Sequence, residues 1–361
     1  RGEINNLYVK GAGDPSLVEE RVWRIAKDIR ARSVKKITGD IVIDNSFFDN
    51  FDFPGQDDES SRAYNAQLSP LAVNFNSFAV NAINEGGVVD VTIDPPVDYF
   101  NLVKTAVQAK GNDLSISRVF KDGKDWVSVM GGVSDEKKKY ANVTDPVLYA
   151  GEVIRWALTQ NGVEFVGKIV SGPAVGKKIL IKDNSKPLSI ILRDLNKFSN
   201  NFTAEMIVKT LGAIKNGAPG STEKGVQVLK DFVKGQGVND VEVQIACGSG
   251  LSRGNLVSPR VFDTVLMSAY HNNRIRSDLM ASFSIAGVDG TLEHRLRSPE
   301  LLGNVKAKTG TLFDVSSLSG YLETASKKMV AFTIIVNGEG AAAGTYLDMQ
   351  EKILLDVYKS F

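Results

Sequence analysis

The sequence predicts an α+β protein in which an antiparallel sheet flanked by helices is combined with an inserted α/β domain and a smaller β-rich insert. Two observations carry this prediction. β-Branched and apolar runs across residues 308–336 are typical of paired core strands, whereas residues 187–271 show the spacing of amphipathic helices. The chain before residue 185 mixes both patterns, which is typical of an α/β region.

Changes in composition divide the chain into four segments. Residues 1–94 and 141–184 form the two parts of the inserted domain, and residues 95–140 form the small β-rich insert between them. An Asp-Pro-Pro sequence, which interrupts regular structure, lies at the first edge of that insert. Residues 185–361 are expected to form the domain that carries the functional site.

Local signals place the elements of the inserted domain. Ser16 and Glu19 have the spacing of a capping box, and an apolar stripe at helical spacing follows them. Asp145 is expected to cap a second helix that begins with Pro146. Strands are expected over residues 7–9, 38–44, 71–80, 88–93, 114–120, 126–130, 168–175 and 178–181.

In the last segment, helical periodicity dominates until the final strands. Apolar stripes predict helices over residues 188–195, 202–211, 221–234, 259–269 and 346–358. The first two helices are separated by a polar break at residues 198–201. Residues 315–321 and 329–336 are expected to form a hairpin of core strands, with residues 308–312 leading into it.

Composition excludes several classes of partner. The 361 residues carry 43 basic and 42 acidic side chains, so charge gives no reason to expect binding to nucleic acid. The longest apolar runs are too short for a membrane-spanning helix. Because Cys247 is the only cysteine, no internal disulfide can form. His271 and His294 lack the spacing of metal ligands, so neither a metal nor a cofactor is expected.

Two short motifs attract attention because each occurs once. Ser199-Asn200-Asn201 is the only Ser-x-Asn sequence and lies in the helix break, and Lys308 begins the only Lys-Thr-Gly sequence, at the start of a strand. Alone, the first is an ordinary helix stop and the second an ordinary solvated lysine. Their order and their separation of roughly a hundred residues are those used by β-lactamases and penicillin-binding proteins.

Three longer segments extend this likeness. Residues 199–205, 248–256 and 285–292 resemble the low-molecular-mass class C penicillin-binding proteins, which are D-alanyl-D-alanine carboxypeptidases and endopeptidases. The resemblance covers nearly the whole chain. It implies that residues 185–361 form a transpeptidase domain like that of penicillin-binding proteins and β-lactamases. Cys247 is a departure, because the family usually carries an aspartate before Gly-Ser-Gly-Leu-Ser.

The resemblance also implies roles for individual residues in acyl transfer from a peptide. Ser199 takes part in proton transfer to the leaving group, Asn201 binds the substrate amide and the lysines around the nucleophile, and Lys308 tunes the proton relay and attracts the substrate carboxylate. In the substrate-binding strand, Thr309 binds that carboxylate, and Thr311 offers its backbone N–H to the oxyanion. Gly310 has no side chain to obstruct the approach of the ligand.

The nucleophile of this family is the serine of a Ser-x-x-Lys motif that opens an apolar helix. Three such strings begin at Ser33, Ser134 and Ser221, but they lie at a helix end, in a charged run and at a helix cap, respectively. We therefore expect the nucleophile to lie in a segment that precedes Arg1 in the parent protein. An intact mass near 39.1 kDa would mean that this segment is absent from the protein.

These observations lead to one principal hypothesis and one alternative. The principal hypothesis is a serine DD-peptidase that hydrolyses peptidoglycan stem peptides through an acyl-enzyme and is acylated by β-lactam antibiotics. By family resemblance, it acts in the periplasm or elsewhere outside the cytoplasm. The alternative is a non-catalytic module that binds D-Ala-D-Ala ends or peptidoglycan. The sequence does not distinguish carboxypeptidase from endopeptidase, and it sets no oligomeric state.

Overall fold

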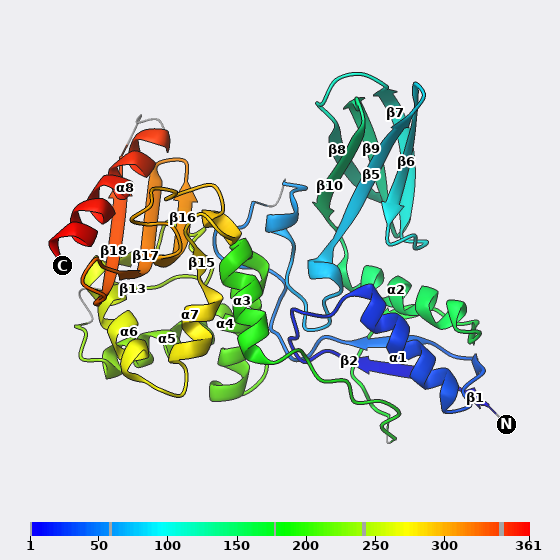
Figure 1. Cartoon of the computed structure of the whole chain (residues 1–361). Helices are drawn as coiled ribbons and strands as arrows, with labels where there is room; N and C mark the ends of the chain where they lie inside the picture. The colour runs from blue at the N-terminus through cyan, green and yellow to red at the C-terminus, as the bar shows by residue number, and fades with distance from the viewer. Residues whose placement is uncertain (1, 58–59, 177, 240–242, 339–342) are drawn as a thin grey trace. The chain divides into compact units, whose positions relative to one another are not determined.

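The computed structural model of the chain describes residues 2–57, 60–176, 178–239, 243–338 and 343–361. The chain forms two compact units, coloured from blue to green and from green to red in Figure 1. One comprises Arg1–Ser185 and Glu205–Lys224, and the other comprises Lys186–Ala204 and Gly225–Phe361. The division into four segments stays a prediction, and the structure assigns residues 205–224 to the first unit.

The part of the first unit before residue 186 contains, among its described residues, short parallel sheets and two α-helices. Helices α1 (Glu19–Ala31) and α2 (Pro146–Gln160) pack against each other, and Asp145 caps α2 as expected by accepting the N–H groups of Val147 and Leu148. One sheet has the order β12-β4-β2 and the other β1-β3-β11. Their strands are β1 (Glu3–Ile4), β2 (Leu7–Lys10), β3 (Lys36–Ile37), β4 (Ile41–Asp44), β11 (Glu164–Phe165) and β12 (Ile169–Ser171).

The β-rich part of this unit contains two three-stranded sheets, drawn in cyan and teal in Figure 1. The first has the order β10-β5-β6 and the second β7-β9-β8. Because β10 pairs with β5, the strands on either side of the predicted insert boundary belong to one sheet. The strands are β5 (Ser77–Glu85), β6 (Val88–Asp94), β7 (Phe100–Gln108), β8 (Ser115–Lys121), β9 (Lys124–Gly132) and β10 (Glu136–Asn142).

The strands expected over residues 38–44 and 168–175 are shorter in the structure, at Ile41–Asp44 and Ile169–Ser171, and two other expected strands differ further. The strand expected from residue 71 begins only at Ser77, because the three residues before it, Asn74–Asn76, have φ angles of 50°, 58° and 49°. That left-handed conformation is incompatible with a strand. The second difference concerns residues 178–181, which form no strand in the described part of the chain.

The predicted capping box at Ser16 is also wrong. The backbone N–H and the hydroxyl of Ser16 both donate to Asp14, at 2.8 and 2.6 Å. The side-chain oxygen of Asn74 instead accepts the N–H of Glu19 at the start of α1. A residue 55 positions along the chain thus supplies the acceptor that the local pattern assigned to Ser16.

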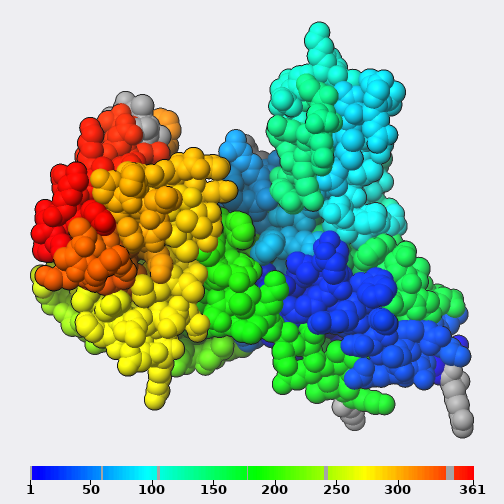
Figure 2. All heavy atoms as spheres, in the orientation of Figure 1, coloured from blue at the N-terminus to red at the C-terminus, as the bar shows by residue number. Residues whose placement is uncertain are grey.

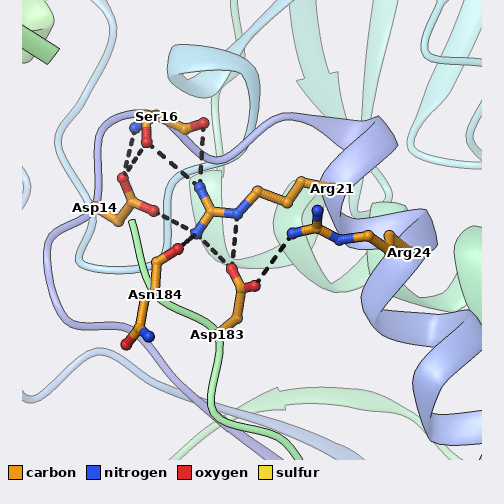
Figure 3. Close-up of polar contacts among 6 residues, drawn as sticks. All are labelled: Asp14, Ser16, Arg21, Arg24, Asp183 and Asn184. Atoms are coloured by element: carbon orange, nitrogen blue, oxygen red, sulfur yellow. Dashed lines mark hydrogen bonds and ion pairs between the residues drawn. The ribbon is translucent and has the colours of Figure 1, made fainter. Parts of the chain in front are cut away.

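Arg21 on α1 connects two segments that are distant in sequence (Figure 3). Its guanidinium forms ion pairs with Asp14 and Asp183, and it donates to the carbonyl oxygen of Asn184 at 2.8 Å. Arg24, about one turn after Arg21 on the same helix, also lies 3.5 Å from the carboxylate of Asp183. These contacts anchor the irregular stretch that precedes the second unit.

The second unit is built on a four-stranded antiparallel sheet with the order β15-β16-β17-β18, which confirms the predicted sheet. Its strands are β15 (Ser284–Ile285), β16 (Val305–Leu312), β17 (Val315–Glu323) and β18 (Met329–Asn337). β15 pairs only with Lys306 and Ala307 of β16. Beyond Ala307, β16 therefore has a paired strand on one side only, among the described residues. A small pair of strands, β13 (Val243–Gln244) and β14 (Leu256–Val257), lies outside this sheet.

Helices cover both faces of this sheet. Leu318 and Leu322 on one face of β17 belong to a buried cluster with Leu354 of α8 (Ala343–Ser360). On the other face, Tyr321 packs with Leu266 of α6 (Pro259–His271). Burying such side chains stabilises the unit by roughly 1.5–3 kcal/mol each. The space-filling view shows the red helix α8 lying directly against the orange strands (Figure 2). The remaining helices are α3 (Leu188–Phe198), α4 (Asn201–Asn216), α5 (Thr222–Gly235) and α7 (Arg276–Ser282).

Candidate active site

The first part of the candidate site is the break between α3 and α4. Helix α3 ends at Phe198 because Ser199 adopts a left-handed conformation, with φ 54° and ψ 49°. Asn200 then caps α4, since its side-chain oxygen accepts the N–H of Thr203 at 2.9 Å. Asn201 is the first residue of α4, and its half-buried side chain has no hydrogen-bond partner among the described residues. The break thus presents the side chains of Ser199 and Asn201 together.

The second part is Lys308 on β16. Its Nζ donates to the hydroxyl of Ser199 at 2.7 Å and to the carbonyl oxygen of Thr309 at 2.5 Å. The structure therefore brings the two motifs into direct contact across 109 positions of sequence. Burial lowers the pKa of Lys308 to about 8, because desolvation penalises the charged ammonium. A lysine with this pKa can both donate and accept a proton near neutral pH.

The side chains of the Lys-Thr-Gly triplet do not all lie on one face of β16. Side chains alternate between the faces of a strand. Lys308 is paired with Ser319, on the sheet face that α6 covers, and Thr309 is paired with Leu318, on the face that α8 covers. Lys308 and Thr309 therefore point to opposite faces, and exposed Thr311 lies on the same face as Thr309.

The loop over residues 286–292, which follows β15, contacts the segments that carry both motifs. Lys197 of α3, two residues before Ser199, donates a hydrogen bond to the carboxylate of Asp289 at 2.5 Å. Thr291 in the same loop accepts a hydrogen bond from the hydroxyl of Thr309 at 2.8 Å. At Gly290, whose φ is 59°, a Cβ atom would lie 2.9 Å from the carbonyl oxygen of Lys197, so a side chain would push the loop away from α3.

On the face that carries Thr309 and Thr311, the unit has a cavity of about 250 Å³. Its polar lining includes both hydroxyls and the guanidinium-bearing Arg295, and its apolar lining comes from the end of β16, the start of β17 and the first turns of α8. The lining residues are Thr291, Arg295, Thr309, Thr311, Leu312, Phe313, Val315, Ser316, Tyr346 and Leu347.

Cys247 replaces the usual aspartate without leaving its loop unsupported. The thiol is 3% exposed and lies 3.2 Å from the side-chain amide of Asn255, which donates to it. The N–H of Ser252 donates to the same sulfur at 3.4 Å. The sulfur atom is therefore an acceptor that closes the glycine-rich loop, although sulfur is a weaker acceptor than oxygen.

The three Ser-x-x-Lys strings have other roles in the structure. Ser33 has a φ of 67° in the turn after α1, and the hydroxyl of Ser134 donates to the carbonyl oxygen of Gly111. Ser221 caps α5 by accepting the N–H of Lys224 at 3.0 Å. Each serine lies in the first unit, whereas Ser199 and Lys308 lie in the second. The location of the nucleophile before Arg1 stays a prediction.

Sequence reasoning identified Ser199 and Lys308 but missed the residues that surround them. Asp289 and Thr291 lie in a segment that carried the family resemblance, yet no local pattern revealed which motif each would contact. Arg295 gave no signal at all, because the cavity it lines is completed by residues of α8 about fifty positions later. Among the described residues, no group of three or more His, Cys, Asp or Glu side chains could hold a metal ion.

A lysine on a partly unpaired strand donates a hydrogen bond to a serine in a helix break, and this arrangement fits the class of penicillin-recognising serine acyltransferases. The chain belongs to the D-Ala-D-Ala carboxypeptidase 3 (S13) family, whose model matches residues 1–355. The predicted resemblance to class C penicillin-binding proteins is therefore confirmed, and so is the predicted enzyme class, a serine-type D-Ala-D-Ala carboxypeptidase.

Curated relatives support this assignment over most of the chain. The D-alanyl-D-alanine carboxypeptidase of an Actinomadura species is 34% identical, covering 95% of this chain and 68% of the relative. The D-alanyl-D-alanine carboxypeptidase DacB of Haemophilus influenzae is 31% identical, covering 92% of this chain and 72% of the relative.

Solved structures confirm the predicted fold. The crystal structure of penicillin binding protein 4 from Haemophilus influenzae is similar with a TM-score of 0.84 and 27% identity, covering 99% of this chain and 83% of that one. The same protein complexed with a novel β-lactam gives a TM-score of 0.77 at the same identity and coverage.

Proposed function

We propose that this protein is a DD-peptidase that hydrolyses peptidoglycan stem peptides through an acyl-enzyme. The observation that carries the proposal is the 2.7 Å hydrogen bond between Lys308 and Ser199, which supplies a proton path at the centre of the second unit. Acyl transfer requires a nucleophile, a base, an acid for the leaving amine and donors for the oxyanion. Ser199 and Lys308 fit the acid and base roles.

In the proposed mechanism, the proton released by the nucleophilic serine reaches the leaving amine through Ser199. Lys308 stabilises this relay from the opposite side of the Ser199 hydroxyl, and its lowered pKa keeps both protonation states accessible. Asn201, whose side chain has no partner among the described residues, binds the amide of the substrate. Ser199 and Lys308 form the hydrogen-bonded pair, and Asn201 lies two positions after Ser199.

The substrate lies along β16 beyond Ala307, where β15 no longer pairs with this strand. The backbone N–H of Thr311 is one of two donors for the oxyanion, and Gly310 leaves the approach to the strand open. Thr309 and Thr311 offer hydroxyl groups to the carboxylate at the end of the substrate. Preorganised donors of this kind typically contribute roughly 100- to 1000-fold to kcat each.

The proposal includes the partners and the location of the protein. Peptidoglycan peptides are the substrates, and β-lactam antibiotics acylate the same nucleophile. Because such substrates lie outside the cytoplasm, we place the protein in the periplasm or at the cell surface. Among the described helices, none has both the length and the apolar character needed to cross a membrane.

Digestion of purified muropeptides by the full-length protein tests this proposal. Uncross-linked pentapeptides should lose their terminal D-alanine if the protein is a carboxypeptidase, and cross-linked dimers should become monomers if it is an endopeptidase. Mass spectrometry separates these products. A protein that leaves both substrates intact, under conditions in which its fold is preserved, would contradict the proposed function.

A further inference from the structure

The cavity beside β16 is lined by a cationic side chain, Arg295, on the face of the sheet opposite Lys308. Thr309 and Thr311 line this cavity together with Arg295, whereas the ammonium of Lys308 is directed toward Ser199. A ligand that accepts hydrogen bonds from the two threonine hydroxyls therefore meets the guanidinium of Arg295 in the same cavity. The alternation of side chains along β16 separates this cation from the one in the proton relay.

Arg295 is held from behind by a short chain of hydrogen bonds. Its Nη2 donates to the side-chain oxygen of Gln350 at 2.8 Å, and the amide nitrogen of Gln350 donates to the hydroxyl of Ser316 at 3.1 Å. Gln350 is fully buried and Ser316 is 4% exposed, so both are fixed in position. This chain of hydrogen bonds orients the guanidinium of Arg295, which lines the cavity, from the side of α8.

The charge of Arg295 lacks a close counterion. Within the described residues, the guanidinium forms no ion pair, although the carboxylate of Glu351 acts on it from a greater distance. A half-buried guanidinium without a paired carboxylate is costly to maintain unless an anion is to be bound there. A guanidinium also matches the planar geometry of a carboxylate, to which it can donate two parallel hydrogen bonds.

We propose that Arg295 determines specificity for a free carboxylate at the end of the substrate, which it binds in the cavity shared with Thr309 and Thr311. This inference rests on the proposed function and deepens it. Two cations then have separate tasks: Arg295 recognises the carboxylate, and Lys308 serves the proton relay on the other face. The apolar side chains Leu312 and Leu347 limit access of water, which strengthens the electrostatic attraction in the cavity.

A pair of substrates that differ only in their terminal charge tests this division. One is an N-acylated peptide ending in D-Ala-D-Ala with a free carboxylate, and the other is the same peptide with a C-terminal amide. We expect the full-length protein to prefer the acid. Arg295→Gln should lower kcat/KM for the acid by roughly 10- to 100-fold, as expected for loss of a hydrogen bond between charged groups, and change kcat/KM for the amide by less than about 3-fold.

Control variants distinguish a specific effect from general damage to the fold. Arg297→Gln removes an exposed arginine two positions away, outside the cavity lining, and should keep the preference for the acid. Arg295→Lys keeps the charge and should retain more of the preference than Arg295→Gln. Lys308→Ala should slow hydrolysis of both substrates by a similar factor.

The ratio of the two kcat/KM values is measured on the same protein preparation, so partial unfolding cancels. An unchanged ratio in Arg295→Gln, or equal ratios in Arg295→Gln and Arg295→Lys, would overturn the role of Arg295 while leaving the proposed function intact. A wild-type protein that cleaves neither peptide nor any muropeptide would instead contradict the proposed function, and this inference would fall with it.

Discussion

Lys308 should titrate far below an ordinary lysine, and this property has a measurable effect on stability. Its pKa is lowered from 10.5 to about 8 by burial. Holding the charged form in this site at neutral pH therefore costs roughly 3 kcal/mol, because each unit of pKa corresponds to about 1.4 kcal/mol. Replacing the ammonium by an apolar group of similar length, as in Lys308→Met, removes that cost.

The sign of the effect follows from proton binding. Between pH 8 and pH 10.5, the unfolded chain holds more protons on this lysine than the folded chain does, so the free energy of unfolding rises with pH in this window. Below pH 8, both states are protonated and the contribution is constant. From pH 7 to pH 10, the wild type should gain about 2.5 kcal/mol of stability relative to Lys308→Met.

Urea denaturation of the two proteins at pH 7 and pH 10 measures this gain. Because all other ionisable groups are shared, their contributions cancel in the difference between wild type and variant. A direct titration by NMR, using ¹³C-labelled lysine and Lys308→Met to assign the signal, should place the pKa near 8. A stability difference that does not change between the two pH values, with a lysine signal that titrates above pH 10, would refute the reasoning.

Three further substitutions test the contacts around the site and in the first unit. Asp289→Asn weakens the bond that holds Lys197 near the helix break, so kcat should fall roughly 10-fold with little change in KM; an unaltered kcat in steady-state assays would argue against this brace. Cys247→Ala removes the sulfur acceptor of the glycine-rich loop and should lower the free energy of unfolding by about 1 kcal/mol, measured as a lower Tm. An equal or higher Tm would count against that contact. Arg21→Met removes the ion pairs with Asp14 and Asp183 and leaves Asp183 only its longer contact with Arg24. It should cost about 2 kcal/mol in thermal unfolding, and the idea of an anchor fails if the Tm is unchanged.

The parts of the site that sequence reasoning recovered depend on local signals. The helix break at Ser199 follows from polar residues between two apolar stripes, and the strand at Lys308 from the β-branched residues that follow it. The separate faces of Lys308 and Thr309 follow from the two-residue period of a strand, so this feature was open to prediction as well.

Other features depend on contacts between distant segments. The acceptor for Glu19 comes from Asn74 rather than from Ser16, because the fold brings a turn from a later segment to the start of α1. The cavity beside Arg295 is likewise completed only when α8 packs on the sheet. No local propensity encodes these contacts, since they depend on tertiary packing rather than on the conformation of neighbouring residues.

The central claim is that the Ser199–Lys308 pair serves an acyl-transfer site. Covalent labelling of the full-length protein with fluorescent penicillin tests it most directly, because the label reports formation of the acyl-enzyme. The account predicts that the wild type is labelled and that Lys308→Ala is labelled much more slowly at equal protein concentration. A full-length, folded protein that is never labelled would contradict the enzyme assignment, and labelling of Lys308→Ala at the wild-type rate would contradict the role of Lys308.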